Sequence, residues 1–199
     1  MPAPILYYIR HGETEWNALG RLQGTQDIPL NDLGRKQAAH VGGVLADLFA
    51  RDGRDKFSLP FVACPLGRAR ATMELVRSAL DLPPHDYATD DRLREIAYGE
   101  WEGSTLNQAQ ARDGDLFARR LADKWNVSAP GGESYAAVQA RVSEWYRSLA
   151  ADTVAVAHGG TARALMVELG FETEQSAADL YIEQGAVYVF GDGRLTKYS

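Results

Sequence analysis

The sequence has few of the features that mark secreted, membrane-embedded or disulfide-rich proteins. It contains a single cysteine, Cys64, so no disulfide can form within the chain, and a reducing, cytoplasmic setting is the simplest expectation. No apolar run approaches the length of a membrane span, so we expect no membrane contact. The opening residues, MPAPILYYIR, lack a basic start followed by a long apolar stretch, so we expect no secretion signal.

An excess of basic charge is also missing. The chain has 21 lysines and arginines against 27 aspartates and glutamates, which gives a net charge of −6. Without a broad basic face, nucleic acid is not an expected partner. An anionic ligand would have to be attracted locally, by a few arginines that converge on one site.

Several motifs that would indicate a cofactor or a serine nucleophile are absent. The sequence has no His-x-His pair, no cysteine cluster and no run of carboxylates at metal spacing, so we expect no metal. It lacks the Gly-rich loop ending in Gly-Lys-Ser or Gly-Lys-Thr that binds nucleotide triphosphates. It also lacks the Gly-x-Ser-x-Gly elbow of many serine hydrolases. We therefore expect chemistry carried by side chains, with no cofactor.

What is present predicts one α/β domain over residues 1–199, with a small insertion. The length and the 45% hydrophobic content are enough for a sizeable core. Short apolar runs rich in β-formers predict strands at 4–9, 59–63, 85–90 and 153–157, and a hairpin at 186–199 around GDG. Helical spacing of apolar residues predicts helices at 29–53, 66–82 and 158–170. The pattern is weaker at 103–132, which we interpret as a mainly helical cap.

Strands that alternate with helices are typical of a three-layer fold. We expect a mostly parallel sheet with helices on both faces and an antiparallel hairpin at its C-terminal edge. Ligands in such sheets bind beyond the carboxyl ends of the strands. His11, the segment Cys64–Arg68 and His158 each directly follow a predicted strand. We therefore expect them to meet in one crevice, roofed by 103–132.

The positions of the four histidines distinguish those expected to be functional from those expected to be structural. His40 lies among alanines in a predicted helix and His85 follows two prolines, so both are expected to pack or to lie at the surface. His11 and His158 each follow an apolar strand and precede a glycine, which favours a functional role.

Two arginines accompany the two histidines at these strand ends. Arg10 directly precedes His11, and Arg68 begins the helix after the second strand. The planar guanidinium matches phosphate oxygens, and a neutral imidazole is a good nucleophile toward phosphorus. The pattern indicates a compact cationic pocket for a phosphorylated ligand.

The same residues match a family. RHGETEWN, followed by RLQGTQDIPLNDLGRKQA, resembles the signature of the histidine phosphatases, the superfamily that includes cofactor-dependent phosphoglycerate mutase. CPLGRARAT resembles the family's second-strand motif, LREIAYGEWEG its acidic motif and VAVAHGGTARAL its second histidine motif. The resemblance covers nearly the whole chain, with the motifs in the same order.

The resemblance implies a role for each matching residue. His11 would be the nucleophile, and Glu95 would donate a proton to the leaving oxygen and then activate water. A protonated His158 would hold the phosphoryl oxygens together with two arginines. The remaining implied site residues contact phosphate or substrate: Arg10, Arg68, Asn17 and Gly159 for the phosphate, and Gln23 and Gly24 for the substrate.

These roles favour a metal-independent hydrolase of phosphomonoesters that forms a phosphohistidine, with a mutase as the alternative. The mutases that the family includes are usually longer than this chain, and they usually have asparagine at the position of Gly160. Both differences favour hydrolysis. Arg119, Arg120 and Lys124 in the cap favour a mutase, because they could bind a second anionic group.

Two further alternatives remain open. Cys64 and Arg70 fit a Cys-x5-Arg phosphate loop, although Pro65 removes one of its backbone donors and the family usually has serine at the position of Cys64. A non-catalytic module that binds phosphorylated ligands would be expected to lack some of the implied catalytic residues, and all of them are present in this sequence. The expected substrate is a small phosphorylated molecule; its identity and the oligomeric state do not follow from the sequence.

Overall fold

The computed structural model describes residues 3–199, and in this range six strands form one mixed sheet in the order β3-β2-β4-β1-β5-β6. β1, β2, β3 and β4 are parallel, whereas β5 is antiparallel to β1 and pairs with β6 in the terminal hairpin. This confirms the predicted sheet. The strands are β1 Leu6–Arg10, β2 Phe61–Ala63, β3 Ala88–Thr89, β4 Thr153–Ala157, β5 Val187–Gly191 and β6 Arg194–Tyr198.

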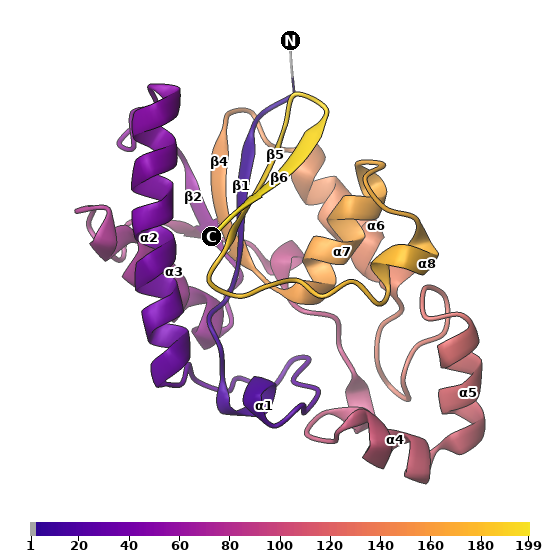
Figure 1. The fold of residues 1–199 in the computed structure, drawn as a ribbon. Coiled ribbons are helices and arrows are strands. Elements are labelled where there is room, and N and C mark those ends of the chain that lie inside the picture. Colours follow the sequence, from indigo (N-terminus) through magenta and orange to yellow (C-terminus); the bar gives the residue numbers. More distant parts are fainter. Residues whose placement is uncertain (1–2) are drawn as a thin grey trace.

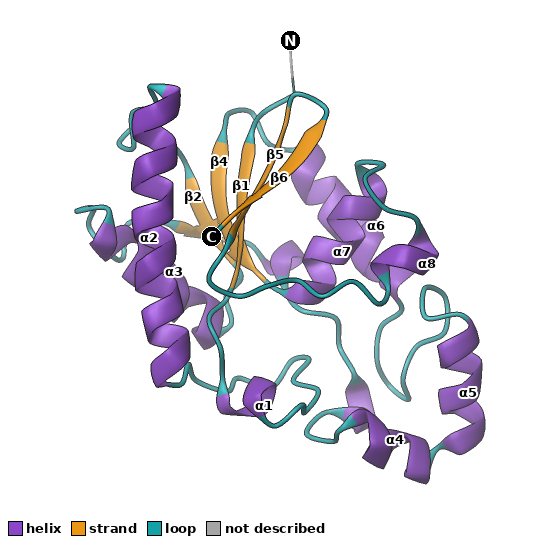
Figure 2. Ribbon diagram, in the orientation of Figure 1, coloured by secondary structure: helices purple, strands orange, loops and turns teal. Residues whose placement is uncertain are grey.

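Helices cover both faces of the sheet, so the fold has the three predicted layers (Figures 1 and 2). α2 (Asp32–Asp52) packs against α3 (Gly67–Ala79) on one face, and α6 (Tyr135–Arg147) packs against α7 (Gly159–Glu168) on the other. The shorter helices are α1 Glu15–Ala18, α4 Leu106–Arg112, α5 Gly114–Ala122 and α8 Glu174–Ala177, with 3-10 turns η1 Asp91–Leu93 and η2 Gly99–Trp101.

The longest helix, α2, illustrates how local sequence sets the boundaries. The Asn31 side chain accepts a hydrogen bond from the Gly34 amide and starts the helix, and Gly53 ends it in a left-handed conformation with φ 61°. The two adjacent glycines inside α2 differ in their surroundings. At Gly42 an added Cβ would lie 2.4 Å from Ala79 Cβ, so α2 and α3 pack closely there. At Gly43 an added Cβ would have no neighbour within 4 Å.

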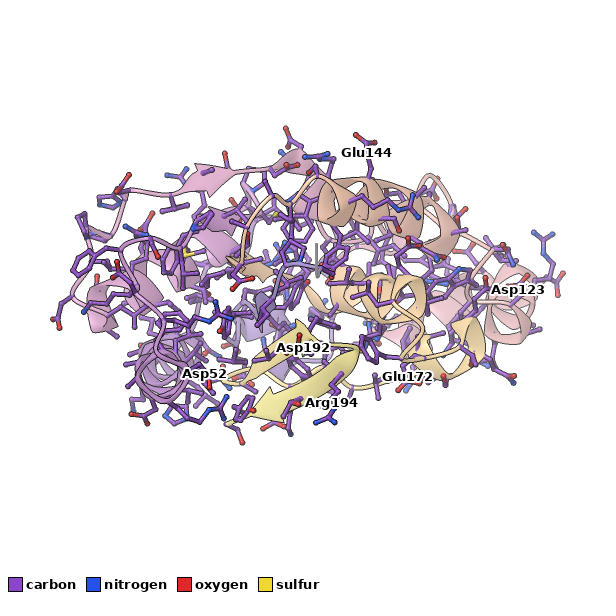
Figure 3. The ribbon with its side chains drawn as sticks, turned by 90° about the horizontal axis from the view of Figure 1, so that it is seen from above. Asp52, Asp123, Glu144, Glu172, Asp192 and Arg194 are labelled. Carbon is purple, nitrogen blue, oxygen red and sulfur yellow. The ribbon has the colours of Figure 1, made fainter. Side chains whose placement is uncertain are left out.

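The core lies in the sheet and between the sheet and its helices. Leu6–Ile9 and the whole of β4 are buried, as expected for parallel strands covered on both sides. Figure 3, which views the molecule from above, shows the charged side chains of Glu144 and Asp123 at the periphery. Among residues 3–199, no helix combines the length and the apolar character needed to cross a bilayer.

Two segments differ from the sequence prediction. α6 was not predicted, although Ser134 caps it and Tyr135, Val138, Val142 and Trp145 share its buried face. The segment 103–132 is helical only over α4 and α5, and the rest is loop. In Figure 1, α4 and α5 lie with α1 beyond the carboxyl ends of the parallel strands. We call residues 103–132 the cap segment.

Candidate active site

The carboxyl ends of three parallel strands bring the predicted residues together. Arg10 ends β1 and His11 follows it, while His158 lies between β4 and α7. The His11 amide still donates to the Ala157 carbonyl at 2.9 Å, so the sheet pairing continues one residue beyond the strand. As a result, the ring centroids of His11 and His158 are only 5.0 Å apart.

A cleft of about 170 Å³ opens at this point. Every predicted site residue except His158 contributes to its walls, and the His158 ring stands beside that of His11. The cleft also contains residues that the sequence did not single out. The lining residues are Arg10, His11, Asn17, Arg21, Leu22, Gln23, Gly24, Arg68, Glu95, Tyr98, Gly159 and Arg163.

The environment of His11 suits a nucleophile. Its side chain is 2% exposed, and its Nδ1 lies 2.7 Å from the Gly12 carbonyl oxygen. Because a carbonyl only accepts hydrogen bonds, Nδ1 carries the proton and Nε2 keeps its lone pair. Burial lowers the pKa of His11 well below its usual value, and Arg68 and Arg10 lower it further. The imidazole is therefore neutral at physiological pH.

His158 is also held neutral in this structure. Burial lowers its pKa well below the usual value, with further lowering by Arg68 and His11. This differs from the protonated form that the family resemblance implies. The side chain is fully buried, and neither ring nitrogen has a hydrogen-bond partner among residues 3–199. Buried polar atoms normally have partners, so these nitrogens indicate a ligand site.

The two arginines are fixed by backbone carbonyls rather than by carboxylates. Arg10 Nη1 donates to the Ile182 oxygen at 2.5 Å. Arg68 Nη1 and Nη2 donate to the oxygens of Gln26 and Gly24 at 2.5 and 2.8 Å. Neither guanidinium forms an ion pair within the described chain, and each Nε is buried without a partner. Their positive charge is therefore available to an anion.

The orientation of Asn17 follows from its donors. Its Oδ1 accepts hydrogen bonds from the Thr14 amide and hydroxyl at 3.2 Å and from Gln184 Nε2 at 3.0 Å. The amide nitrogen of Asn17 is thereby left as the group that can donate into the cleft. Gln184 also donates to the His11 carbonyl at 3.2 Å. No sequence motif marked Gln184, which reaches the site from the loop before β5.

Glu95 is held against the start of α7. Its Oε1 accepts hydrogen bonds from the amides of Gly160 and Ile96, both at 2.9 Å. The fit depends on glycine at position 160, because an added Cβ would lie 2.2 Å from Glu95 Oε1. Arg141 donates to the Glu95 carbonyl at 3.3 Å and so holds the backbone. One carboxylate oxygen is anchored, and Oε2 remains for proton exchange.

The comparisons with known proteins agree with this geometry. The sequence model of the histidine phosphatase superfamily (branch 1) matches residues 6–192. The chain belongs to this superfamily. It is 33% identical to a 2,3-bisphosphoglycerate-dependent phosphoglycerate mutase of Methylobacterium radiotolerans, over 94% of this chain and 88% of that protein.

Two solved structures share the fold. YhfR of Bacillus stearothermophilus is 30% identical, with a TM-score of 0.77 over 98% of this chain and 95% of that one. The alpha-ribazole phosphatase of Shigella flexneri is 24% identical, with a TM-score of 0.79 over 96% of this chain and 93% of that one, which shows a common fold only.

Glu102 holds the loop that carries Gln23 and Gly24. The Glu102 carboxylate accepts hydrogen bonds from the amides of Thr25 and Tyr98 at 2.9 and 3.1 Å. Gly24 adopts φ +53°, and a Cβ there would lie 2.0 Å from Glu102 Oε1. Glu102 therefore positions the loop beside the cleft.

The cysteine-based alternative has no support in the positions of Cys64 and Arg70. Cys64 is fully buried, and burial raises its pKa to about 11, so the thiolate needed for attack is disfavoured. Arg70 is exposed, donates to the Tyr87 hydroxyl at 3.3 Å and does not line the cleft. A Cys-x5-Arg phosphate loop would need both groups at the ligand.

The cap cations do not face the phosphate cleft. Arg119 is exposed and lines neither the cleft nor the larger pocket beside it. Arg120 donates to the carbonyls of Lys124 and Val127 at 3.5 and 3.3 Å, and Lys124 forms an ion pair with Asp179. Arg120 and Lys124 instead line the larger pocket that adjoins the cleft, so a second anion would meet them there and not in the cleft.

Arg163 is a cleft residue that the sequence reasoning missed. Its Nε donates to the Leu180 carbonyl at 2.8 Å and its Nη1 to the Tyr135 hydroxyl at 3.0 Å. The sequence spacing could have indicated it, because Arg163 follows Gly159 by four positions and so lies on the same face of the helix.

Proposed function

We propose that this protein hydrolyses small phosphomonoesters through a phosphohistidine on His11, without a metal. The observation that carries the proposal is the neutral His11, with Nε2 free, beside two arginines that form no direct ion pair with a carboxylate among residues 3–199. A neutral nucleophile next to such arginines suits attack on a phosphate dianion. We further propose that residues 1–199 act as one domain, with the cap segment over the cleft.

Two displacements complete the proposed reaction. First, His11 Nε2 attacks phosphorus, the bond from phosphorus to the leaving oxygen breaks, and Glu95 gives that oxygen its proton. The released alcohol leaves a phosphohistidine and an ionised Glu95. Second, Glu95 takes a proton from water, the resulting hydroxide attacks phosphorus, and the bond to Nε2 breaks. Inorganic phosphate leaves, and both side chains return to their starting states.

The phosphoryl group would be held by groups already in place. Arg10, Arg68 and the Asn17 amide line the cleft, and the Gly159 amide lies at the positive end of α7. A phosphate dianion beside His158 favours the charged imidazolium, so substrate binding raises the pKa of His158. We propose that His158 takes up a proton when substrate binds.

A phosphoglycerate mutase is the second candidate. It is supported by the name of the Methylobacterium relative at 33% identity. A mutase must hold the second anionic group of a bisphosphate while the phosphoryl group moves. Lys124 is paired with Asp179, and the exposed Arg119 lines neither the cleft nor the pocket beside it. These positions of two of the three cap cations favour hydrolysis.

The decisive assay uses 3-phosphoglycerate with the 2,3-bisphosphoglycerate primer, and separately a panel of phosphomonoesters, all with a chelator present. We expect free phosphate from the panel, no dependence on metal, and no formation of 2-phosphoglycerate. Accumulation of 2-phosphoglycerate without free phosphate would replace the hydrolase by the mutase.

The nucleophile is tested by substitution and by trapping. We expect His11→Ala to lower kcat/KM by at least about 10⁴-fold, because the covalent step is lost. The unaltered protein, quenched in alkali during turnover of a ³²P-labelled ester, should carry label on His11. Cys64→Ser is the control and should keep its activity. An active His11→Ala protein would contradict the mechanism, and no trapped label with any ester would support a non-catalytic module.

A further inference from the structure

A larger pocket lies beside the phosphate cleft. It has a volume of about 300 Å³, compared with about 170 Å³ for the cleft. The two share Leu22, Tyr98 and Arg163 as lining residues, so they meet along a common wall. A group attached to a phosphate in the cleft can therefore extend into the pocket.

The walls of this pocket are mainly aromatic and aliphatic. The rings of Trp101 and Phe117 lie 5.8 Å apart at an interplanar angle of 41°. Leu106 and Leu121, 53% and 62% exposed, bring apolar surface to the same pocket from α4 and α5. The apolar lining consists of Leu22, Tyr98, Trp101, Leu106, Phe117, Leu121, Tyr135 and Ala178. Aromatic walls of this kind favour flat, apolar ligands.

The charges that reach the pocket already have partners. Lys124 pairs with Asp179, and both line it. The Arg120 guanidinium lies over the Tyr98 ring, 5.8 Å from its centroid, and donates to backbone carbonyls. Arg163 is fixed by the Leu180 carbonyl and the Tyr135 hydroxyl. Arg120 and Arg163 form no ion pair with a carboxylate among residues 3–199, so the aromatic and aliphatic lining, and not the charge, indicates the class of leaving group.

We propose that this pocket binds the leaving group, and that the substrate is a phosphomonoester of an aromatic alcohol. The proposal rests on the proposed hydrolysis, and it adds the class of alcohol. The phosphate lies against Arg10, Arg68 and His11, and the ring packs between Leu22, Tyr98, Phe117 and Leu121. Small polar alcohols such as glycerol bind less tightly, because they leave this apolar lining without contacts.

The test compares two esters of primary alkyl alcohols, 2-phenylethyl phosphate and glycerol 3-phosphate, whose intrinsic reactivities are similar. We expect kcat/KM of the full chain to be at least about tenfold higher for 2-phenylethyl phosphate, the range that apolar contacts in a pocket supply. Leu121→Glu places a carboxylate beside the ring and should lower the ratio of the two kcat/KM values about tenfold. Leu121 is exposed, so the fold should tolerate the change.

Leu33→Glu is the matched control. Leu33 is 50% exposed on α2 and lines neither the cleft nor the pocket, so it adds the same charge elsewhere and should leave the ratio unchanged. Equal or higher kcat/KM for glycerol 3-phosphate, or equal ratios in the two variants, would overturn the pocket assignment and leave hydrolysis intact. Absence of phosphate release from both esters, with no label on His11, would overturn the hydrolase and the inference with it.

Discussion

Tyr8 joins the strand that carries His11 to the turn that carries His158. Its hydroxyl donates to the His158 carbonyl at 2.7 Å and accepts a hydrogen bond from the His158 amide at 3.0 Å. The same oxygen lies 2.6 Å from the Thr161 hydroxyl. All three residues are fully buried. The backbone around His158 is therefore positioned from inside the core.

We expect Tyr8→Phe to lower the free energy of unfolding by about 1–3 kcal/mol, because it leaves buried backbone groups of His158 with one partner fewer. Denaturation in urea measures the loss. Tyr7→Phe is the matched control, since the Tyr7 hydroxyl is also buried but has no partner among residues 3–199. Equal losses in the two variants would show that the Tyr8 hydrogen bonds contribute nothing.

The sequence predicted those site residues that directly follow strands, because a parallel sheet brings the ends of its strands together. It did not predict Gln184, which lies 173 positions from His11 and reaches it only through the tertiary fold. The neutral state of His158 also could not be predicted from the sequence. It depends on complete burial beside Arg68 and Arg10, and burial of a polar loop residue cannot be derived from its neighbours in the chain.

Among the elements, α7 contributes most to the chemistry. It begins directly after His158, and its first-turn amides include Gly159 in the cleft and Gly160 on Glu95. The positive end of the helix dipole therefore faces both the proposed phosphate and the proposed acid. Any side chain at position 160 intrudes on this arrangement.

We expect Gly160→Ala to lower kcat for an alkyl phosphate by about 10²-fold, because a Cβ 2.2 Å from Glu95 Oε1 displaces the proton donor. The loss should be much smaller for 4-nitrophenyl phosphate, whose leaving group needs no proton. Gly43→Ala, in open space on α2, is the control and should leave both activities unchanged. Equal losses on the two esters would contradict the role of Glu95 as acid.

The elements that the sequence predicted well are those with a strong periodic pattern, such as β1, β4 and α2. α6 was missed although its buried residues recur at helical spacing, since the preceding Gly-rich loop obscured where it begins. The cap loop at 123–134 could not be predicted. Its path depends on contacts between distant residues, such as the stacking of Trp125 on Tyr135 at 5.2 Å and the ion pair of Glu133 with Arg141.

For the molecule as a whole, the two buried histidines make stability depend on pH. Their pKa values are lowered in the folded chain, whereas the unfolded chain has the ordinary value of about 6.5. Below about pH 6.5 the unfolded chain therefore binds protons that the folded chain does not. As the pH is lowered below about 6.5, the free energy of unfolding should fall by at most about 1.4 kcal/mol per pH unit for each histidine. Above about pH 7, these two histidines should not affect it.

Urea denaturation between about pH 5.5 and about pH 7.5 measures this slope. The double variant His11→Asn and His158→Asn should show a flatter dependence, because neither state then takes up these protons. His40→Gln, at an exposed position on α2, is the control and should retain the slope of the unaltered protein. A double variant with an unchanged slope would show that other groups cause the dependence.

The central place of β1 has a consequence for how activity is lost on warming. β1 pairs with β4 on one side and β5 on the other, so its amides are expected to exchange with solvent only when the whole molecule unfolds. The pocket proposed for the leaving group is lined instead from a small separate cluster around Trp101, Ala109 and Ala129, which we expect to open at a lower free-energy cost. As temperature rises, the protein would lose its discrimination between alcohols before it loses the ability to transfer phosphate.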